Sequence, residues 1–169
     1  MRRTLLFALG GFLVPTIVAL IVLGARPDED GPREGFETFA NANFPFEFAY
    51  PEEFRAASAE GDVPALSLEG PSAITLQRIE PPVPPTDLAA YVAQLIVDEG
   101  ATAHDVRRSR IDMITARIPR DVGGQPAESL LYFFTVRGDT FQMDCQFTSE
   151  HRRRMVRACN RATRTVELK

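Results

Sequence analysis

The first pattern along the chain is an uninterrupted apolar stretch near the N-terminus. Residues 4–25 contain no charged side chain, and these 22 residues would span about 33 Å as a helix, which matches the hydrocarbon core of a bilayer. Pro15 lies in the middle, where transmembrane helices tolerate proline. The pattern predicts one N-terminal transmembrane helix, with residues 1–25 as the anchor. A cleaved signal peptide is the alternative, although its apolar core is usually shorter, at about 7 to 15 residues.

The charges on the two sides of this stretch differ in sign. Arg2 and Arg3 precede it, whereas Asp28, Glu29 and Asp30 follow it. Basic residues are retained on the cytoplasmic side of a membrane helix. We therefore expect a single-pass protein of a bacterial cytoplasmic membrane whose C-terminal domain lies on the extracytoplasmic (periplasmic) side. A cleaved signal peptide would export the same domain.

After the apolar stretch, the pattern changes from linker-like to alternating. Residues 26–43 are rich in Pro, Gly, Asp, Glu and Asn, a composition typical of a solvated linker. Aromatic residues then occupy every second position from Phe44 to Tyr50, which places four rings on one face of a strand. The pattern predicts a domain over residues 44–169 with this aromatic row in its core. A row that lines a ligand cleft is the less favoured alternative.

The next segment reads as a hairpin followed by a helix. Two short apolar runs, 65–68 and 73–79, are separated by the turn signal Glu-Gly-Pro-Ser at 69–72. The proline-rich segment 80–85 should be extended, and a helix should then run from a Thr86 cap to a terminating glycine at residue 100. The apolar stripe of this helix consists of Leu88, Tyr91, Val92, Leu95 and Ile96.

The C-terminal part reads as three strands and a helix. Residues 111–120, 127–137 and 140–148 form an antiparallel meander, joined by glycine-containing turns. The middle strand is apolar on both faces, so both faces need cover. The expected fold is therefore α+β, an antiparallel β-sheet flanked by helices (an α/β/α sandwich). The last helix follows a Ser149 cap, and its inward stripe consists of Met155, Cys159, Ala162 and Val166.

This order of elements, over residues 44–168, resembles the PsbP-like fold family. The resemblance rests on an opening strand that ends Phe-Ala-Tyr-Pro (48–51), the helix after a proline-rich loop, the meander, the closing helix and the segment Gln-Pro-Ala-Glu-Ser-Leu-Leu-Tyr (125–132). The family includes the extrinsic PsbP protein of photosystem II, a Ran-binding nuclear import factor and many bacterial envelope proteins. It has no invariant catalytic motif. The resemblance implies a non-enzymatic binding or assembly protein.

Charge is distributed unevenly along the chain. The formal net charge of −4 gives no general attraction for nucleic acid, so we expect no nucleic-acid partner. Residues 26–105 carry 4 Arg against 16 Asp and Glu, whereas residues 106–169 carry 13 Arg and Lys against 7 acids. Part of this difference can be neutralised by pairing between the two halves.

The basic surplus is concentrated on the last predicted helix. Arg153, Arg157, Arg161 and Arg164 lie on one stripe of that helix, and Arg154 lies beside it. Such a stripe is a candidate contact for an acidic partner or for anionic lipid. A solvated outer face without a partner is the alternative.

The two cysteines are placed to meet. Cys145 shares a strand face with apolar residues, and Cys159 lies on the inward stripe of the following helix. From Cys145 the strand runs about 10 Å to Thr148, and the helix returns about 15 Å to Cys159. Outside the cytoplasm we expect a structural disulfide, while two buried thiols and a redox or metal role are the alternatives.

The chain lacks the residue patterns that usually carry catalysis or metal binding. The two histidines, His104 and His151, have no further ligands at metal-site spacing, and His151 is expected on a helix surface. No serine lies in a Gly-x-Ser-x-Gly setting, and the Gly-Gly of 123–126 reads as a turn. We therefore predict no catalytic, cofactor-binding or metal-binding residues and no cofactor.

These observations lead to two main functional hypotheses. The leading one is a non-enzymatic, membrane-tethered interaction domain, held by residues 4–25, which acts as an accessory or assembly subunit with a membrane protein partner. The second is a binding module for a small apolar or lipid-like ligand at the membrane surface. Hydrolysis by a pair of carboxylates ranks third, because such pairs have no sequence signature.

Overall fold

The computed structural model describes residues 35–58, 64–100, 102–108 and 111–169. The apolar stretch 4–25 lies outside these ranges, and within them no helix has the length and hydropathy needed to cross a membrane. The described elements are β1 (Phe36–Ala40), β2 (Phe46–Pro51), β3 (Arg55–Ser58), β4 (Pro64–Ser67), β5 (Ala73–Ile79), α1 (Leu88–Glu99), β6 (Thr102–Arg108), β7 (Asp112–Val122), β8 (Gln125–Val136), β9 (Asp139–Thr148), α2 (Arg152–Arg164) and β10 (Glu167–Leu168).

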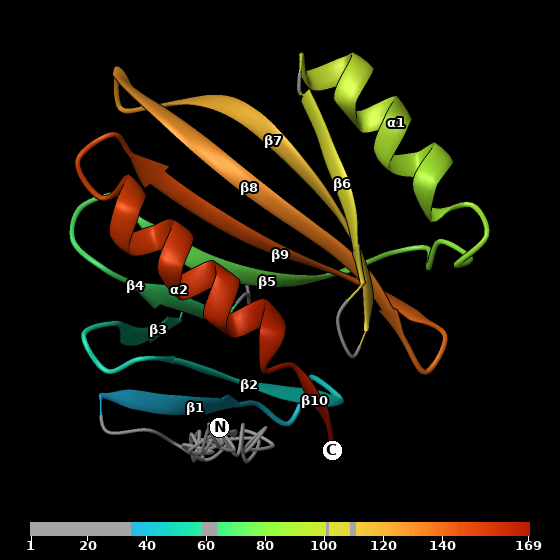
Figure 1. Ribbon diagram of the computed structural model, residues 1–169, viewed down its shortest axis with the longest axis horizontal. Helices are drawn as coiled ribbons and strands as arrows, with labels where there is room; N and C mark the ends of the chain where they lie inside the picture. Colours follow the sequence, from blue (N-terminus) through green and yellow to red (C-terminus); the bar gives the residue numbers. More distant parts are fainter. Residues whose placement is uncertain (1–34, 59–63, 101, 109–110) are drawn as a thin grey trace, which may run out of the picture.

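The larger sheet confirms the predicted hairpin and meander. Its seven strands lie in the order β3-β4-β5-β9-β8-β7-β6, and the neighbours are antiparallel (Figure 1). The hairpin predicted over 65–79 is β4 and β5, and the three predicted meander strands are β7, β8 and β9. Strand β9 pairs with both β5 and β8, so it joins the hairpin to the meander in one sheet.

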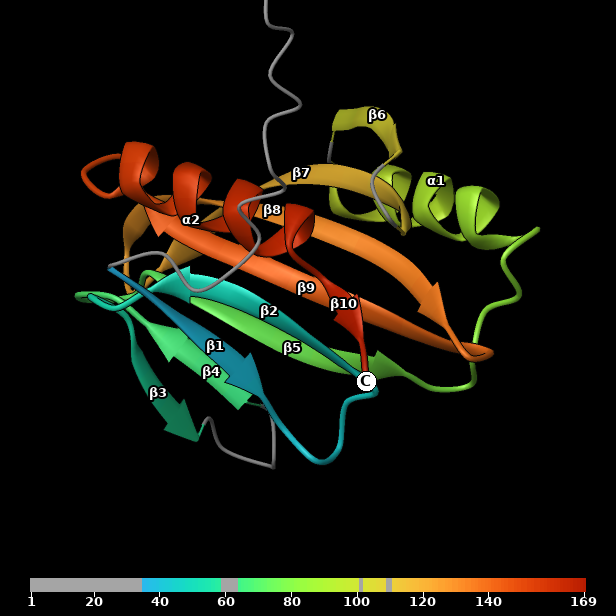
Figure 2. The same cartoon turned by 60° about the horizontal axis from the view of Figure 1, so that its bottom comes forward.

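The expectation of a single sheet between helices needs correction. Strands β1, β2 and β10 form a separate three-stranded antiparallel sheet with β2 in the middle. Figure 2 shows helix α2 running alongside β2. The described fold is therefore mixed α+β with two antiparallel sheets and two helices: α1 covers one face of the large sheet, and α2 and the small sheet share the other.

Strand β8 separates two cores, as its pattern predicts. Leu130 and Phe134 belong to the core beneath α2 and the small sheet, whereas Leu131 and Phe133 belong to the core beneath α1. Alternation along one strand thus supplies apolar surface to both faces. The apolar stripe predicted for helix α1 also packs in the second core, with all of its residues in contact: Leu88, Tyr91, Val92, Leu95 and Ile96.

The aromatic row of β2 and the residues just before it is core, as the favoured reading expects, and not a cleft wall. Its residues are buried, and Phe46 is fully covered. The Phe46 ring packs edge-to-face against Phe134 of β8 at 5.2 Å and against Phe141 of β9 at 5.1 Å between centroids. These rings join the small sheet to the large one. Edge-to-face pairs stabilise this contact beyond what the burial of apolar area alone provides.

The predicted linker boundary also needs correction. Strand β1 lies within the range 26–43, pairs along its whole length with β2 and buries Phe39. Phe39 stacks on Phe48 with centroids 4.9 Å apart. The composition of the segment is polar, but pairing with β2 satisfies its backbone groups, and one buried ring fixes its register.

Strands β3, β6 and β10 have no clear sequence signal. Each lies at the edge of its sheet and is short or largely polar, so its conformation depends on the neighbouring strand. The predicted helix starts also shift slightly: Asp87 and His151 occupy the N-cap positions instead of Thr86 and Ser149. The left-handed Gly100 ends α1 as predicted, with φ 64°.

Candidate functional site

Helix α2 has a buried face and a basic face. Met155, Ala158, Cys159 and Ala162 are fully covered, and the helix contacts β2 and β9. Its outer side carries arginines and no acidic residue at all. The apolar face fixes the helix on the domain, so the basic face is presented outward from a rigid element.

The predicted disulfide is present and attaches this helix to β9. Cys145 of β9 and Cys159 of α2 are bonded, with Cα atoms 6.4 Å apart, and both are fully buried. Neither cysteine is a free thiol in this state, so neither sulfur is available as a metal ligand.

The end of α2 is attached to β2 through Thr165. The Thr165 hydroxyl accepts a hydrogen bond from the backbone N–H of Ala49 at 2.9 Å and donates one to the carbonyl of Arg161 at 2.9 Å. On the neighbouring strand β1, Glu37 accepts a hydrogen bond from the Tyr50 hydroxyl at 2.6 Å. Burial of Tyr50, and secondly its hydrogen bond to Glu37, raise the pKa of Tyr50 to about 12. The Tyr50 hydroxyl is therefore protonated at neutral pH and donates to Glu37. The Thr165 contact thus holds the small sheet against the basic helix, and the Tyr50 contact joins β2 to β1 within that sheet.

Four of the five predicted arginines line one groove, which we call the arginine groove. Arg153, Arg157 and Arg164 are exposed, whereas Arg161 is half-buried. The groove has a volume of about 500 Å³ and lies between α2 and the start of β1. Its lining residues are Phe36, Arg153, Val156, Arg157, Asn160, Arg161 and Arg164.

Arg161 lies against the ring of Phe36. Its guanidinium carbon is 5.2 Å from the ring centroid, a cation–π distance. Its Nε and Nη2 atoms are buried and have no hydrogen-bond acceptor among the described residues. Buried donors are normally paired, so this guanidinium has unused donor capacity next to the groove.

The fifth predicted residue, Arg154, lies outside the groove. Its Nη2 is 2.6 Å from the carboxylate of Glu53, and hydrogen bonding to Glu53 raises the pKa of Arg154. Arg152 likewise lies 3.3 Å from Glu128. In contrast, no carboxylate of the described part of the chain pairs with Arg153, Arg157 or Arg164. The helix therefore separates into paired arginines on one flank and unpaired arginines in the groove.

Sequence reasoning missed the contribution of Phe36 and misplaced His151. Phe36 stands in a polar segment that reads as linker, and the one signal for it is an aromatic residue in such a segment. His151 is buried rather than on the helix surface. Its Nδ1 lies 3.0 Å from the hydroxyl of Ser72, and its Nε2 lies 3.8 Å from Glu69.

The Ser72, His151 and Glu69 side chains contain the group types of a hydrolase triad, but the arrangement is structural. Ser72 is fully buried. It lies in the turn between β4 and β5, whose Pro71 carbonyl also accepts a hydrogen bond from Gln146 at 3.0 Å. A nucleophile must reach its substrate, which a fully buried serine cannot do. The His151 contact instead fastens the turn to the start of α2, and the Gln146 contact fastens it to β9.

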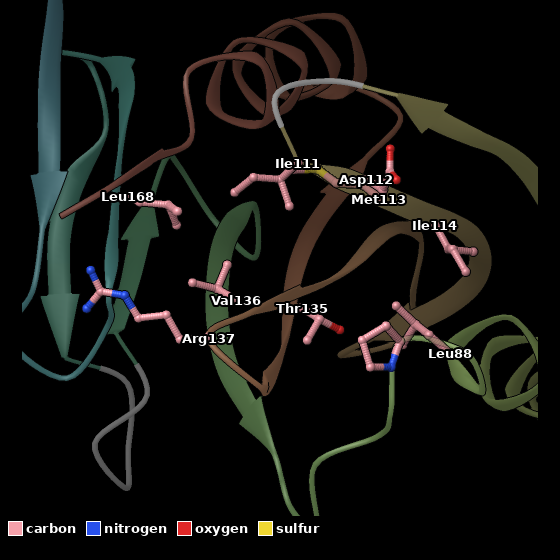
Figure 3. Close-up of a pocket in the computed structure, with 10 residues that line it drawn as sticks. Leu88, Ile111, Asp112, Met113, Ile114, Thr135, Val136, Arg137 and Leu168 are labelled. Carbon is pink, nitrogen blue, oxygen red and sulfur yellow. The ribbon is translucent and has the colours of Figure 1, made fainter.

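A second groove lies beyond the C-terminal end of α2, where it is lined in part by Leu168 of β10. It has a volume of about 550 Å³, and Figure 3 shows its wall side chains, which come from β7, β8, the start of α1 and β10. Most of them are apolar, and the hydroxyl of Thr135 is buried there without a hydrogen-bond partner. The lining residues are Pro85, Leu88, Ile111, Asp112, Met113, Ile114, Thr135, Val136, Arg137 and Leu168.

The remaining candidate chemistry is sparse. Within the described ranges, no group of three or more His, Cys, Asp or Glu side chains is arranged to hold a metal ion. Asp144 is partly buried, and it is the one carboxyl there for which a shift is resolved: burial raises its pKa, and Ser129 and Arg120 oppose the rise. The acidic run at 28–30 and His104 fall outside the described side chains.

Comparison with solved structures identifies the fold. A protein from Bacteroides thetaiotaomicron superposes with a TM-score of 0.58 at 10% identity, over 80% of this chain and 49% of that one, so this chain spans about half the length of that protein. Cyanobacterial PsbP from Synechocystis sp. PCC 6803 gives a TM-score of 0.53 at 12% identity, over 80% of this chain and 93% of that one.

A protein of unknown function from Pseudomonas aeruginosa gives a TM-score of 0.51 at 12% identity, over 79% of this chain and 97% of that one. No protein-family model and no curated protein matches the chain. The chain has a PsbP-like fold, which confirms the resemblance seen in its sequence.

Proposed function

We propose that this chain is a non-enzymatic, membrane-tethered interaction domain that serves as an accessory or assembly subunit of a membrane protein complex. Its PsbP-like fold suggests a non-catalytic accessory or interaction domain. The single observation that carries the proposal further is the arginine groove, a rigid basic surface without carboxylate partners in the described residues.

The spacing of the arginines is unfavourable for the helix itself, although Arg161 and Arg164 also lie in its last turn, where basic residues favour the helix dipole. Arg153, Arg157 and Arg161 follow each other at i, i+4 spacing, and like charges at that spacing destabilise a helix by about 0.2–0.5 kcal/mol per pair. Local rules are broken in this way mainly at functional positions. An acidic partner would convert this repulsion into attraction and would also steer the encounter.

Tethering would place the groove close to the membrane. Ten residues separate Ala25, the end of the expected anchor, from Phe36 in the groove wall. Ten residues span at most about 35 Å even when fully extended. A partner that meets the groove would therefore be embedded in the membrane or bound at its periplasmic surface.

The test is gentle detergent extraction of the full-length chain from its native membrane, followed by size exclusion and mass spectrometry. Wild type should travel with a stoichiometric partner, and the triple change Arg153→Gln, Arg157→Gln, Arg164→Gln should travel alone. The matched control is Arg152→Gln with Arg154→Gln, which removes two charges from the same helix outside the groove and should retain the partner. A wild-type chain that always travels alone would overturn the proposal.

The apolar groove of Figure 3 favours a second candidate function, a binding module for a small apolar or lipid-like ligand at the membrane surface. Its apolar walls and one unpartnered hydroxyl are typical of small-ligand sites. Solvent extraction of the purified full-length chain, with Val136→Glu as a blocked control, tests this candidate. A lipid that is recovered from wild type and not from the control would support it, and equal recovery from both would exclude it.

A further inference from the structure

The arginine groove restricts the shape of its partner. Arg161 lies half-buried against Phe36, while Arg153, Arg157 and Arg164 are exposed around it. A flat surface would meet the exposed arginines and leave Arg161 uncontacted. A carboxylate on a short side chain, in contrast, can approach Arg161 within the groove and, if the side chain turns outward, accept hydrogen bonds from the guanidinium donors that lack a partner.

An acidic group on one flank narrows the basic surface. Glu53 is exposed there and paired with Arg154, whereas Glu37 alternates with Phe36 along β1 and bonds Tyr50 on the other face of the strand. A broad anionic surface such as a bilayer would therefore meet the Glu53 carboxylate as well as the arginines. A narrow acidic chain that follows the groove would meet the arginines alone.

The spacing of the arginines matches that of side chains on a peptide. Arg153, Arg157 and Arg161 are four residues apart, which corresponds to about 6 Å along the helix axis. Side chains on one face of an extended segment recur about every 6.8 Å. The apolar walls, Phe36 and Val156, add contact area for apolar residues placed between the acidic ones.

From these features we infer that the arginine groove binds an acidic segment of a partner protein, with one carboxylate seated against Arg161. The inference rests on the proposed function, because it specifies the chemistry of the partner at the same surface. Arg161 is the specificity-determining residue: Phe36 positions it, and an acidic partner that draws the side chain outward would supply the acceptor that its buried Nε and Nη2 lack, in a forked geometry that the ammonium of a lysine cannot offer. The exposed arginines supply attraction that depends mainly on charge.

The test measures binding of a fluorescent peptide of alternating Asp and Val to the full-length chain in neutral detergent, by anisotropy. Arg161→Lys keeps the charge but removes the fork, and we expect it to weaken binding about tenfold, or about 1.4 kcal/mol. Arg154→Lys is the matched control, since Arg154 is paired with Glu53 outside the groove. A loss for Arg161→Lys no larger than that for Arg154→Lys would overturn the inference.

A second variant guards against misfolding as the cause. Phe36→Leu keeps apolar bulk but removes the ring that orients Arg161. It should also weaken binding of the peptide, while the Cys145–Cys159 bond and the melting temperature of the domain are retained. Short-chain phosphatidylglycerol is the competing probe: displacement of the peptide at a lower concentration than a soluble Asp-Val competitor would assign the groove to lipid and overturn the inference. If native co-purification succeeds while no peptide binds, the inference fails and the proposed function stands.

Discussion

The disulfide gives a prediction whose magnitude follows from chain topology. Cys145 and Cys159 close a loop with a sequence separation of 14, and closing a loop of that length removes about 3 kcal/mol of conformational freedom from the unfolded chain. The bond acts mainly on the unfolded state, because Met155 and Ala162 on either side of Cys159 already hold α2 in place through burial. Reduction should therefore lower the free energy of unfolding by about 3 kcal/mol and leave the position of α2 unchanged.

The assay is urea unfolding of the full-length chain in neutral detergent, oxidised and after reduction in denaturant and refolding with reductant. The reduced protein should unfold at a lower urea concentration with a similar slope. Peptide affinity at the arginine groove should be equal in the two forms, since the folded surface is the same. The double variant Cys145→Ala, Cys159→Ala is the reagent control and should not respond to reductant. Coincident unfolding curves for oxidised and reduced wild type would refute the loop argument.

Three further perturbations test the fold around the site. Phe46→Ala empties the contact between the two sheets and should lower the free energy of unfolding by about 3–5 kcal/mol in urea, and a loss under 1 kcal/mol would contradict its role there. His151→Ala leaves the Ser72 hydroxyl without its partner and should lower the same quantity by about 1–3 kcal/mol. Burial raises the pKa of Asp144, so the folded state holds that proton more tightly, and stability from this group increases as pH falls through the folded-state pKa. Asp144→Asn should therefore be more stable than wild type at neutral pH and lose this advantage in acid. An Asp144→Asn variant that is less stable than wild type at pH 7 in the same urea assay would refute a raised pKa for Asp144.

Much of the described architecture was predictable because local periodicity reflects burial. The alternation in β8 supplies both cores, and the aromatic row that begins at Phe44 forms the core between the sheets. The cysteine pair and the arginine stripe were also predictable, because strand and helix geometry fix which face a residue occupies. These features depend on a residue and its near neighbours in sequence.

What the tertiary structure decided depends on contacts between distant segments. Strand β1 is ordered by pairing with β2 and by the burial of Phe39, so its polar composition alone misleads. His151 is buried because the turn that carries Ser72 folds over the start of α2, 79 positions away in the sequence.

The same reason explains the candidate site. The sequence by itself determined that α2 carries a row of arginines, since helical spacing is local. Which of them are neutralised by Glu53 and Glu128, and which meet Phe36, depends on where β1 and the loop after β2 pack in three dimensions. Tertiary packing therefore places four arginines of α2 in one groove, while Arg152 and Arg154 are paired with carboxylates at the surface.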